Sequence, residues 1–130
     1  MTTEVVTLSV HDSLRLAYDM LSVASVRFFP VLESGKVIGV VSWADVMRAT
    51  LASAKGGGDH PVRELLSGVS VKDVSMAPAT TVPPNTTARE AARLMLQKHL
   101  ECLVVVEKDA VVGIATKTDF LREFVKEQST

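Results

Sequence analysis

The sequence contains an internal repeat. Shifted by 74 positions, residues 7–52 align with residues 81–126 without a gap. Apolar character is preserved at many of the aligned positions, and nine pairs are identical: Thr7/Thr81, Arg15/Arg89, Ala17/Ala91, Val31/Val105, Glu33/Glu107, Val37/Val111, Gly39/Gly113, Asp45/Asp119 and Arg48/Arg122. Because a repeated sequence folds into repeated supersecondary units, we expect the chain to build one unit twice.

Each copy has the pattern of a strand, a helix, two strands and a last helix. Thr87 and Glu90 have the spacing of a capping box, in which a hydroxyl and a carboxylate satisfy free N–H groups at a helix start. Apolar residues then recur at helical spacing, and short polar turns separate the paired strands. The pattern predicts an α+β fold whose elements are 5–8, 13–24, 28–32, 36–41 and a helix from Ser42, then 80–82, 87–98, 102–106, 111–115 and a helix from Thr116.

The expected division of the chain is a first copy at 1–52, a flexible linker at 53–74 and a second copy at 75–130. Three consecutive glycines and a proline within 56–61 are typical of a solvated linker. Residues 62–68 have the pattern of a short helix that ends at Gly68. A phosphate loop is not expected, because no Gly-Lys-Ser/Thr sequence follows the glycines.

Composition and motifs argue against several classes of function. The formal net charge of −1 gives no overall attraction to nucleic acid or to an anionic membrane, and no uncharged apolar run approaches the ~18 residues of a membrane span. The N-terminus does not resemble a secretory signal, and a single cysteine favours a reducing cytoplasm. We expect no metal site, because the three histidines share no ligand spacing. No catalytic residues are expected either, because no nucleophile and base motif is present.

Two short strings repeat the same chemistry, GVVSWAD at 39–45 and GIATKTD at 113–119. Each runs from an apolar strand into a helix start, with a hydroxyl residue at the N-cap and an aspartate three residues later. This arrangement stabilises a helix start by about 1 kcal/mol without any ligand. On one copy alone, helix capping is therefore the simpler interpretation.

Taken together, FPVLE (29–33), GVVSWAD, VKDVSM (71–76), VVVE (104–107) and GIATKTD resemble the CBS-domain pair, also called a Bateman module. The resemblance covers nearly the whole chain. It implies two motifs packed by pseudo-twofold symmetry, with clefts between them that commonly hold adenine nucleotides and less often S-adenosylmethionine or a dinucleotide. It also implies a regulatory module with no reaction of its own, here stand-alone and without a fused effector domain.

The family position of the aspartates suits a ribose, because a carboxylate can accept hydrogen bonds from two neighbouring hydroxyls. The helix start beside it favours a phosphate. We expect the second copy to bind first, through Thr116, Lys117, Thr118 and Asp119. The family pattern adds Ile114 against the base, with Val26, Arg27 and Cys102 approaching the same cleft, and Ser42 and Asp45 for the first copy.

Many nucleotide-binding relatives carry His or Arg just before the first apolar strand of the hairpin. This chain has Arg27 there in the first copy and Glu101 in the second, and Glu101 would repel a phosphate. The expected ligand is therefore one with few phosphates, such as AMP or adenosine. AMP is expected first, then ADP, ATP or S-adenosylmethionine, acting as a regulatory ligand and not as a required cofactor. An alternative is a ligand-free dimerisation or adaptor protein.

The resemblance also implies partners. Two pairs usually associate through their helices, so a homodimer is expected, and a separate effector protein would read the signal. The last helix carries more apolar residues than one face requires, and part of the dimer surface is expected among Phe120, Leu121, Phe124, Val125, Val46, Met47 and Leu51.

Overall fold

The computed structural model of the 130-residue chain describes residues 5–23, 27–54, 62–74 and 76–128. The chain forms two compact units: Val6–Pro78 form the first, and Ala79–Thr130 form the bulk of the second. The glycine-rich stretch expected to be flexible, 55–61, lies outside the described residues.

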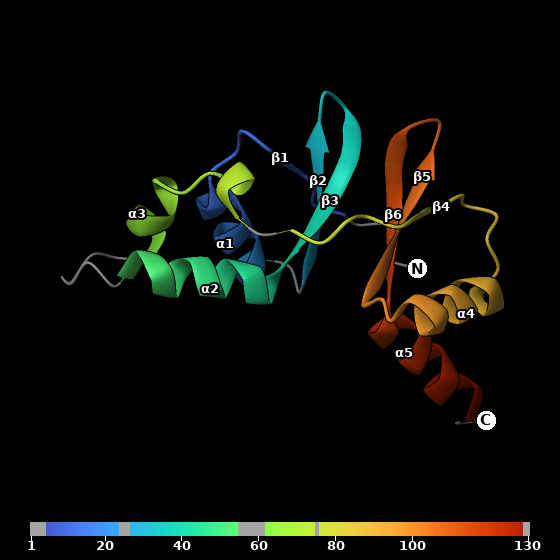
Figure 1. Cartoon of the computed structure of the whole chain (residues 1–130). Coiled ribbons are helices and arrows are strands. Elements are labelled where there is room, and N and C mark those ends of the chain that lie inside the picture. Colours follow the sequence, from blue (N-terminus) through green and yellow to red (C-terminus); the bar gives the residue numbers. More distant parts are fainter. Residues whose placement is uncertain (1–4, 24–26, 55–61, 75, 129–130) are drawn as a thin grey trace. The chain divides into compact units, whose positions relative to one another are not determined.

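The first unit contains a three-stranded sheet with strand order β1-β2-β3 (Figure 1). Strand β1 pairs parallel to β2, and β2 pairs antiparallel to β3. The elements are β1 (Leu8–Ser9), α1 (Leu14–Val23), β2 (Phe28–Glu33), β3 (Lys36–Ser42), α2 (Trp43–Ala54), α3 (Val62–Ser67) and a 3-10 turn, η1 (Val71–Asp73).

The second unit repeats this sheet with strand order β4-β5-β6. Its elements are β4 (Thr81–Val82), α4 (Ala88–Lys98), β5 (Cys102–Glu107), β6 (Ala110–Thr116) and α5 (Lys117–Gln128). The irregularity in the ladder falls between Val31 and Leu32 in one hairpin and between Val105 and Val106 in the other. These two places are separated by the 74 residues of the repeat offset. The predicted α+β fold and its duplication are confirmed.

The hairpin turns also correspond. Both central residues of each turn have a positive φ, namely Ser34 and Gly35 in the first unit, and Lys108 and Asp109 in the second. Two-residue turns of this kind match the right-handed twist of the strands that they join.

The first strand of the first copy differs from the prediction. It was expected at residues 5–8, but β1 starts at Leu8, and its ladder pairs Leu8 with Val31 and Ser9 with Leu32. The strand then ends because the Asp12 carboxylate accepts the Ser9 N–H at 2.7 Å and turns the chain toward α1.

The core of the first unit draws on the segment between the two copies. Helix α3 contacts α1 and α2, and both Leu66 of α3 and Val71 of η1 are fully buried. They join a cluster made of Leu8, Val10, Leu14, Ala17, Phe29, Val31, Val41, Val46, Leu66 and Val71. Val46 therefore lies in the core and not on a dimer surface, where it was expected.

The second unit has a smaller core cluster, made of Ala91, Met95, Leu103 and Ala115. Helix α4 starts with the predicted capping box: the Glu90 N–H donates to Thr87 Oγ1 at 3.1 Å, and the Thr87 N–H donates to Glu90 Oε2 at 3.1 Å. In the part of the chain that the structure describes, no helix is long and apolar enough to cross a membrane.

A segment that follows η1 pairs with the outer edge of β3. Val40 and Ala77 exchange two backbone hydrogen bonds, at 2.9 and 3.1 Å. The chain approaches β3 so closely here that a Cβ atom on Gly39 would lie 2.6 Å from Met76 Sδ and 3.0 Å from the Ala77 carbonyl oxygen. Position 39 therefore requires glycine, because residues 76 and 77 lie too close to β3 to leave room for a side chain.

Candidate functional site

The repeated strings form two equivalent helix starts. Strand β3 ends at Ser42 and α2 begins at the next residue, and β6 and α5 meet in the same way after Thr116. In both, the hydroxyl oxygen of the cap residue accepts the backbone N–H of the aspartate in the first turn, and the aspartate carboxylate accepts the backbone N–H of the cap residue. The simple capping interpretation is thus realised at both places.

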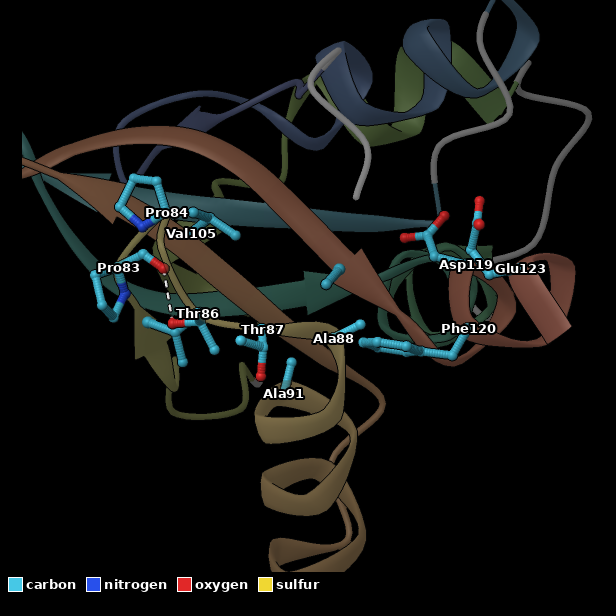
Figure 2. Close-up of a pocket in the computed structure, with 12 residues that line it drawn as sticks. Pro83, Pro84, Thr86, Thr87, Ala88, Ala91, Val105, Asp119, Phe120 and Glu123 are labelled. Carbon is cyan, nitrogen blue, oxygen red and sulfur yellow. Dashed lines mark hydrogen bonds between the residues drawn. The ribbon is translucent and has the colours of Figure 1, made fainter. Parts of the chain in front are cut away.

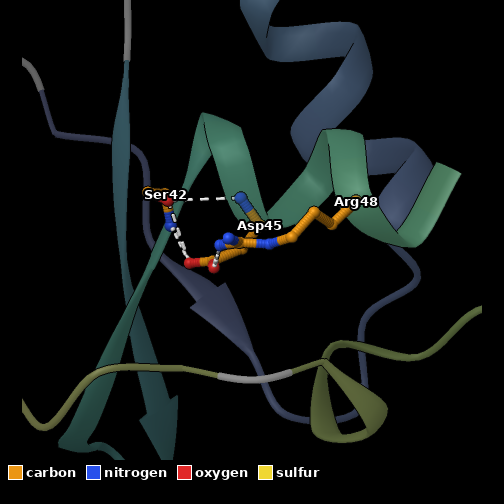
Figure 3. A network of polar contacts seen from close by, with 3 residues as sticks. All are labelled: Ser42, Asp45 and Arg48. Carbon is orange, nitrogen blue, oxygen red and sulfur yellow. Dashed lines mark hydrogen bonds and ion pairs between the residues drawn. The ribbon is translucent and has the colours of Figure 1, made fainter. Parts of the chain in front are cut away.

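At the first helix start, both carboxylate oxygens of Asp45 have partners (Figure 3). Oδ2 accepts hydrogen bonds from the backbone N–H and the hydroxyl of Ser42, each at 2.9 Å. Oδ1 contacts the guanidinium of Arg48, one turn further along α2. A ligand at Asp45 would have to share or displace the Arg48 contact.

At the second helix start, Asp119 Oδ2 accepts the Thr116 N–H at 2.9 Å, and the Asp119 N–H donates to Thr116 Oγ1 at 3.4 Å. Helix α5 begins beside this pair, so the partial positive charge of its N-terminus lies at the same place. Thr116 and Asp119 are therefore held together by the fold.

Lys117, the first residue of α5, forms an ion pair with Glu101. Lys117 Nζ lies 3.1 Å from Glu101 Oε1, and both side chains are more than half exposed. The Lys117 N–H also donates to the Glu101 carbonyl at 3.4 Å. The sequence predicted Lys117 as a ligand-binding residue; in the structure its charge is matched by the Glu101 carboxylate.

A pocket of about 190 Å³ lies beside Asp119 within the second unit (Figure 2). Its walls come from the loop before α4, the first turn of α4, the sheet and the start of α5. The lining residues are Val82, Pro83, Pro84, Thr86, Thr87, Ala88, Ala91, Val105, Ala115, Asp119, Phe120 and Glu123. The cavity is largely apolar, and the carboxylates of Asp119 and Glu123 lie on one side of it.

The other predicted site residues lie in different places. Thr118 faces a separate hollow on α5 with Leu121 and Val125. Ile114 is buried in β6, and Cys102 is half-buried at the start of β5. Arg27 is exposed in the first unit, and Val26 lies outside the described residues.

Burial, and to a lesser extent the negative charge of Glu101, raise the pKa of the Cys102 thiol to about 11. The thiol therefore stays protonated near neutral pH, and a protonated thiol is a poor nucleophile. Cys102 is a packing residue in this structure. Among the described residues, no group of three or more His, Cys, Asp or Glu side chains could hold a metal ion.

Sequence reasoning missed Glu123 and Phe120 as pocket residues. Glu123 follows Asp119 by four positions, so both carboxylates share one face of α5. This four-residue spacing was the sequence signal that could have placed Glu123 beside Asp119. The wall formed by Pro83 and Pro84 had no such signal, because it depends on how the loop before α4 folds back toward α5.

Comparison with known proteins identifies the family. The family model for the CBS domain matches residues 1–52 and 71–126. The CBS domain-containing protein YhcV of Bacillus subtilis is 29% identical over 92% of this chain and 78% of YhcV. An inosine-5′-monophosphate dehydrogenase of Korarchaeum cryptofilum is 30% identical over 92% of this chain, which spans only 22% of that enzyme.

Solved structures show the same fold. The Vibrio cholerae protein described as AcuB is 26% identical, with a TM-score of 0.77 over 98% of this chain and 89% of that one. The CBS domain pair of protein MJ0100, solved with 5′-methylthioadenosine and S-adenosyl-L-methionine, is 21% identical, with a TM-score of 0.75 over 98% of this chain and 93% of that one. With its two motifs and two matching units, this chain belongs to the CBS domain family as a tandem CBS pair.

Proposed function

We propose that this protein is a non-catalytic regulatory module that binds an adenosine-containing ligand at the second helix start. The observation that carries the proposal is the position of Asp119, which lines an apolar pocket and is held at the N-terminus of α5 by Thr116. The ligands bound by the MJ0100 CBS pair both contain adenosine, which supports the same ligand class here. AMP, ADP, ATP and S-adenosylmethionine are the candidates from sequence.

Asp119 can serve as both a cap and a ribose ligand. An ionised carboxylate has two oxygens and about four acceptor positions. The hydrogen bond from the Thr116 N–H fixes the orientation of the side chain. Ordinary helix capping thus prepares the geometry that a vicinal diol requires.

The first helix start is the second candidate. Asp45 accepts two hydrogen bonds from Ser42 and pairs with Arg48, so a ribose there competes with a cation of the protein. We expect the second unit to bind its ligand first, because a pocket lies beside Asp119.

The test is thermal unfolding of the full chain with AMP, ADP, ATP, S-adenosylmethionine and 5′-methylthioadenosine, in wild type and in Asp119→Ala. A ligand at a hundred times its Kd adds about 2.7 kcal/mol to the free energy of unfolding, which raises Tm by several degrees. We expect this increase with at least one ligand in wild type, and its loss in Asp119→Ala.

Asp45→Ala is the matched control, because it removes the equivalent capping carboxylate from the other copy. Both variants should lose about 1 kcal/mol from the lost cap, but Asp45→Ala should keep the ligand-induced shift. If no ligand shifts Tm in folded wild-type protein, the adaptor alternative replaces this proposal.

We further propose that the protein acts as a homodimer that signals to a separate effector protein, in a reducing cytoplasm as its single cysteine suggests. Three apolar side chains of α5 are exposed: Leu121 at 64%, Phe124 at 60% and Val125 at 61%. Leu51 of α2 is exposed to the same extent. Apolar side chains gathered on a helix in this way are typical of an interaction surface.

Phe124→Glu is expected to convert the dimer to a monomer at micromolar concentration, because it places a charge in an apolar interface. Sedimentation velocity or light scattering measures the mass. Leu96→Glu, at an exposed position on α4, is the control and should stay dimeric. A monomeric wild type would contradict the dimer proposal.

A further inference from the structure

The residue that precedes the hairpin is held beside the helix start in both units. In the first unit the Trp43 N–H donates to the Arg27 carbonyl at 2.8 Å, and in the second the Lys117 N–H donates to the Glu101 carbonyl at 3.4 Å. These bonds fix the backbone of Arg27 and Glu101 against the first residue of each helix. The two positions are equivalent in the repeat, but their side chains carry opposite charges.

Glu101 changes the electrostatics of the second helix start. Its carboxylate lies 3.1 Å from Lys117 Nζ, so the cation nearest in sequence to Thr116 is already matched by a negative charge. A phosphate that binds Lys117 must compete with Glu101 for the ammonium group and remain close to the displaced carboxylate. Like charges at such separations oppose each other.

Among the described residues, the lining of the pocket beside Asp119 carries no positive charge. Of the 12 described residues that line it, none is Lys, Arg or His, and two are the carboxylates Asp119 and Glu123. Lys126 Nζ lies 3.6 Å from Glu123 Oε1, but both side chains are largely exposed, so this ion pair is weak. Arg122 lines the separate hollow with Thr118.

From these charges we propose that the second unit selects adenosine-containing ligands that carry no phosphate, and that Glu101 is the residue that sets this selectivity. The inference rests on the proposed function. A nucleoside keeps the ribose hydroxyls, which can donate hydrogen bonds to Asp119, and the base, which an apolar pocket can bury. It lacks the phosphate dianion that Glu101 repels. Adenosine and 5′-methylthioadenosine then bind ahead of AMP, which reverses the order expected from sequence.

The test compares adenosine with AMP, which differ only in the phosphate, by isothermal titration of the full chain. We expect wild type to prefer adenosine. In Glu101→Arg, which copies Arg27 of the first unit, one negative charge is removed and one positive charge is added. The ratio of the two dissociation constants should therefore move toward AMP by about tenfold or more. Because each ratio is taken within one protein, a change in overall stability does not alter it.

Lys117→Gln is the matched control. It removes the cation and leaves Glu101 unneutralised, so the ratio should move further toward adenosine. The shift in this ratio should become smaller in both variants when the salt concentration is raised from about 0.05 M to 0.5 M, because the charges are exposed and are screened by salt.

Three results would overturn the inference. AMP binding at least as tightly as adenosine in wild type contradicts the selectivity and leaves the proposed function intact. An unchanged ratio in Glu101→Arg removes Glu101 as the determinant. Absence of binding by adenosine, 5′-methylthioadenosine and AMP in wild type and both variants overturns this inference. If ADP, ATP and S-adenosylmethionine also fail to bind, the proposed function is overturned with it.

Discussion

Leu66→Ala is expected to lower the free energy of unfolding of the first unit by about 2–5 kcal/mol. Leu66 belongs to α3, between the two repeat copies, and its exposed fraction is 0%. The substitution removes buried methyl groups and leaves a cavity among Leu14, Phe29 and the rest of the first core cluster. A helix of six residues is not stable alone, so the same change should also loosen α3.

Urea unfolding followed by circular dichroism measures this loss. Leu96→Ala is the control, because it makes the same chemical change at a side chain that is 76% exposed, and it should alter stability by no more than about 0.5 kcal/mol. Equal effects of the two substitutions would mean that α3 does not contribute to the core.

Gly39→Ala is expected to lower the free energy of unfolding by about 2–3 kcal/mol, the upper range for overpacking. The added Cβ would lie 2.6 Å from Met76 Sδ, 2.9 Å from Met76 Cγ and 3.0 Å from the Ala77 carbonyl oxygen. The Met76 side chain can rotate away, but the Ala77 carbonyl is fixed by its hydrogen bond from the Val40 N–H. The backbone pairing of 76–77 with β3 must therefore shift.

Gly68→Ala is the matched control, because a Cβ there meets only the Leu65 carbonyl oxygen, at an ordinary 3.7 Å. We expect little change in stability, and hydrogen exchange should show Val40 and Ala77 losing protection only in Gly39→Ala. Unchanged protection at Val40 in that variant would show that the segment accommodates the methyl group without moving.

The two stability predictions concern contacts made by the segment between the aligned repeat copies. Leu66 and Met76 both lie outside the gapless alignment of 7–52 with 81–126, and both pack on elements of the first unit. A truncation of the chain after residue 52 would therefore remove part of the first core. The first CBS motif as aligned in sequence is smaller than the unit that folds.

Most of the local structure was predictable. The strand and helix order, both hairpin turns and the Thr87 capping box agree with the sequence pattern, and most element ends lie within one or two residues of it. The exception was the first strand, because a two-residue parallel pairing with β2 depends on where Asp12 turns the chain.

The candidate site was predictable only in part. The pairs Ser42/Asp45 and Thr116/Asp119 follow from spacing along one helical turn, and the structure has both pairs hydrogen-bonded. Thr118 lies next to Asp119 in sequence but on a different face of α5. The partner of Lys117 is Glu101, 16 positions away, and its contact depends on the alignment of β5 with β6.

The sequence by itself determined the duplication, the element order and the capped helix starts, because these depend on residues a few positions apart and on one constant offset. Only the tertiary structure decided that Leu66 and Val46 are core residues, that Gly39 must admit Met76, and that Glu101 neutralises Lys117. Each of these is a contact between segments brought together by sheet pairing and helix packing. Local residue preferences carry little information about which distant segments meet.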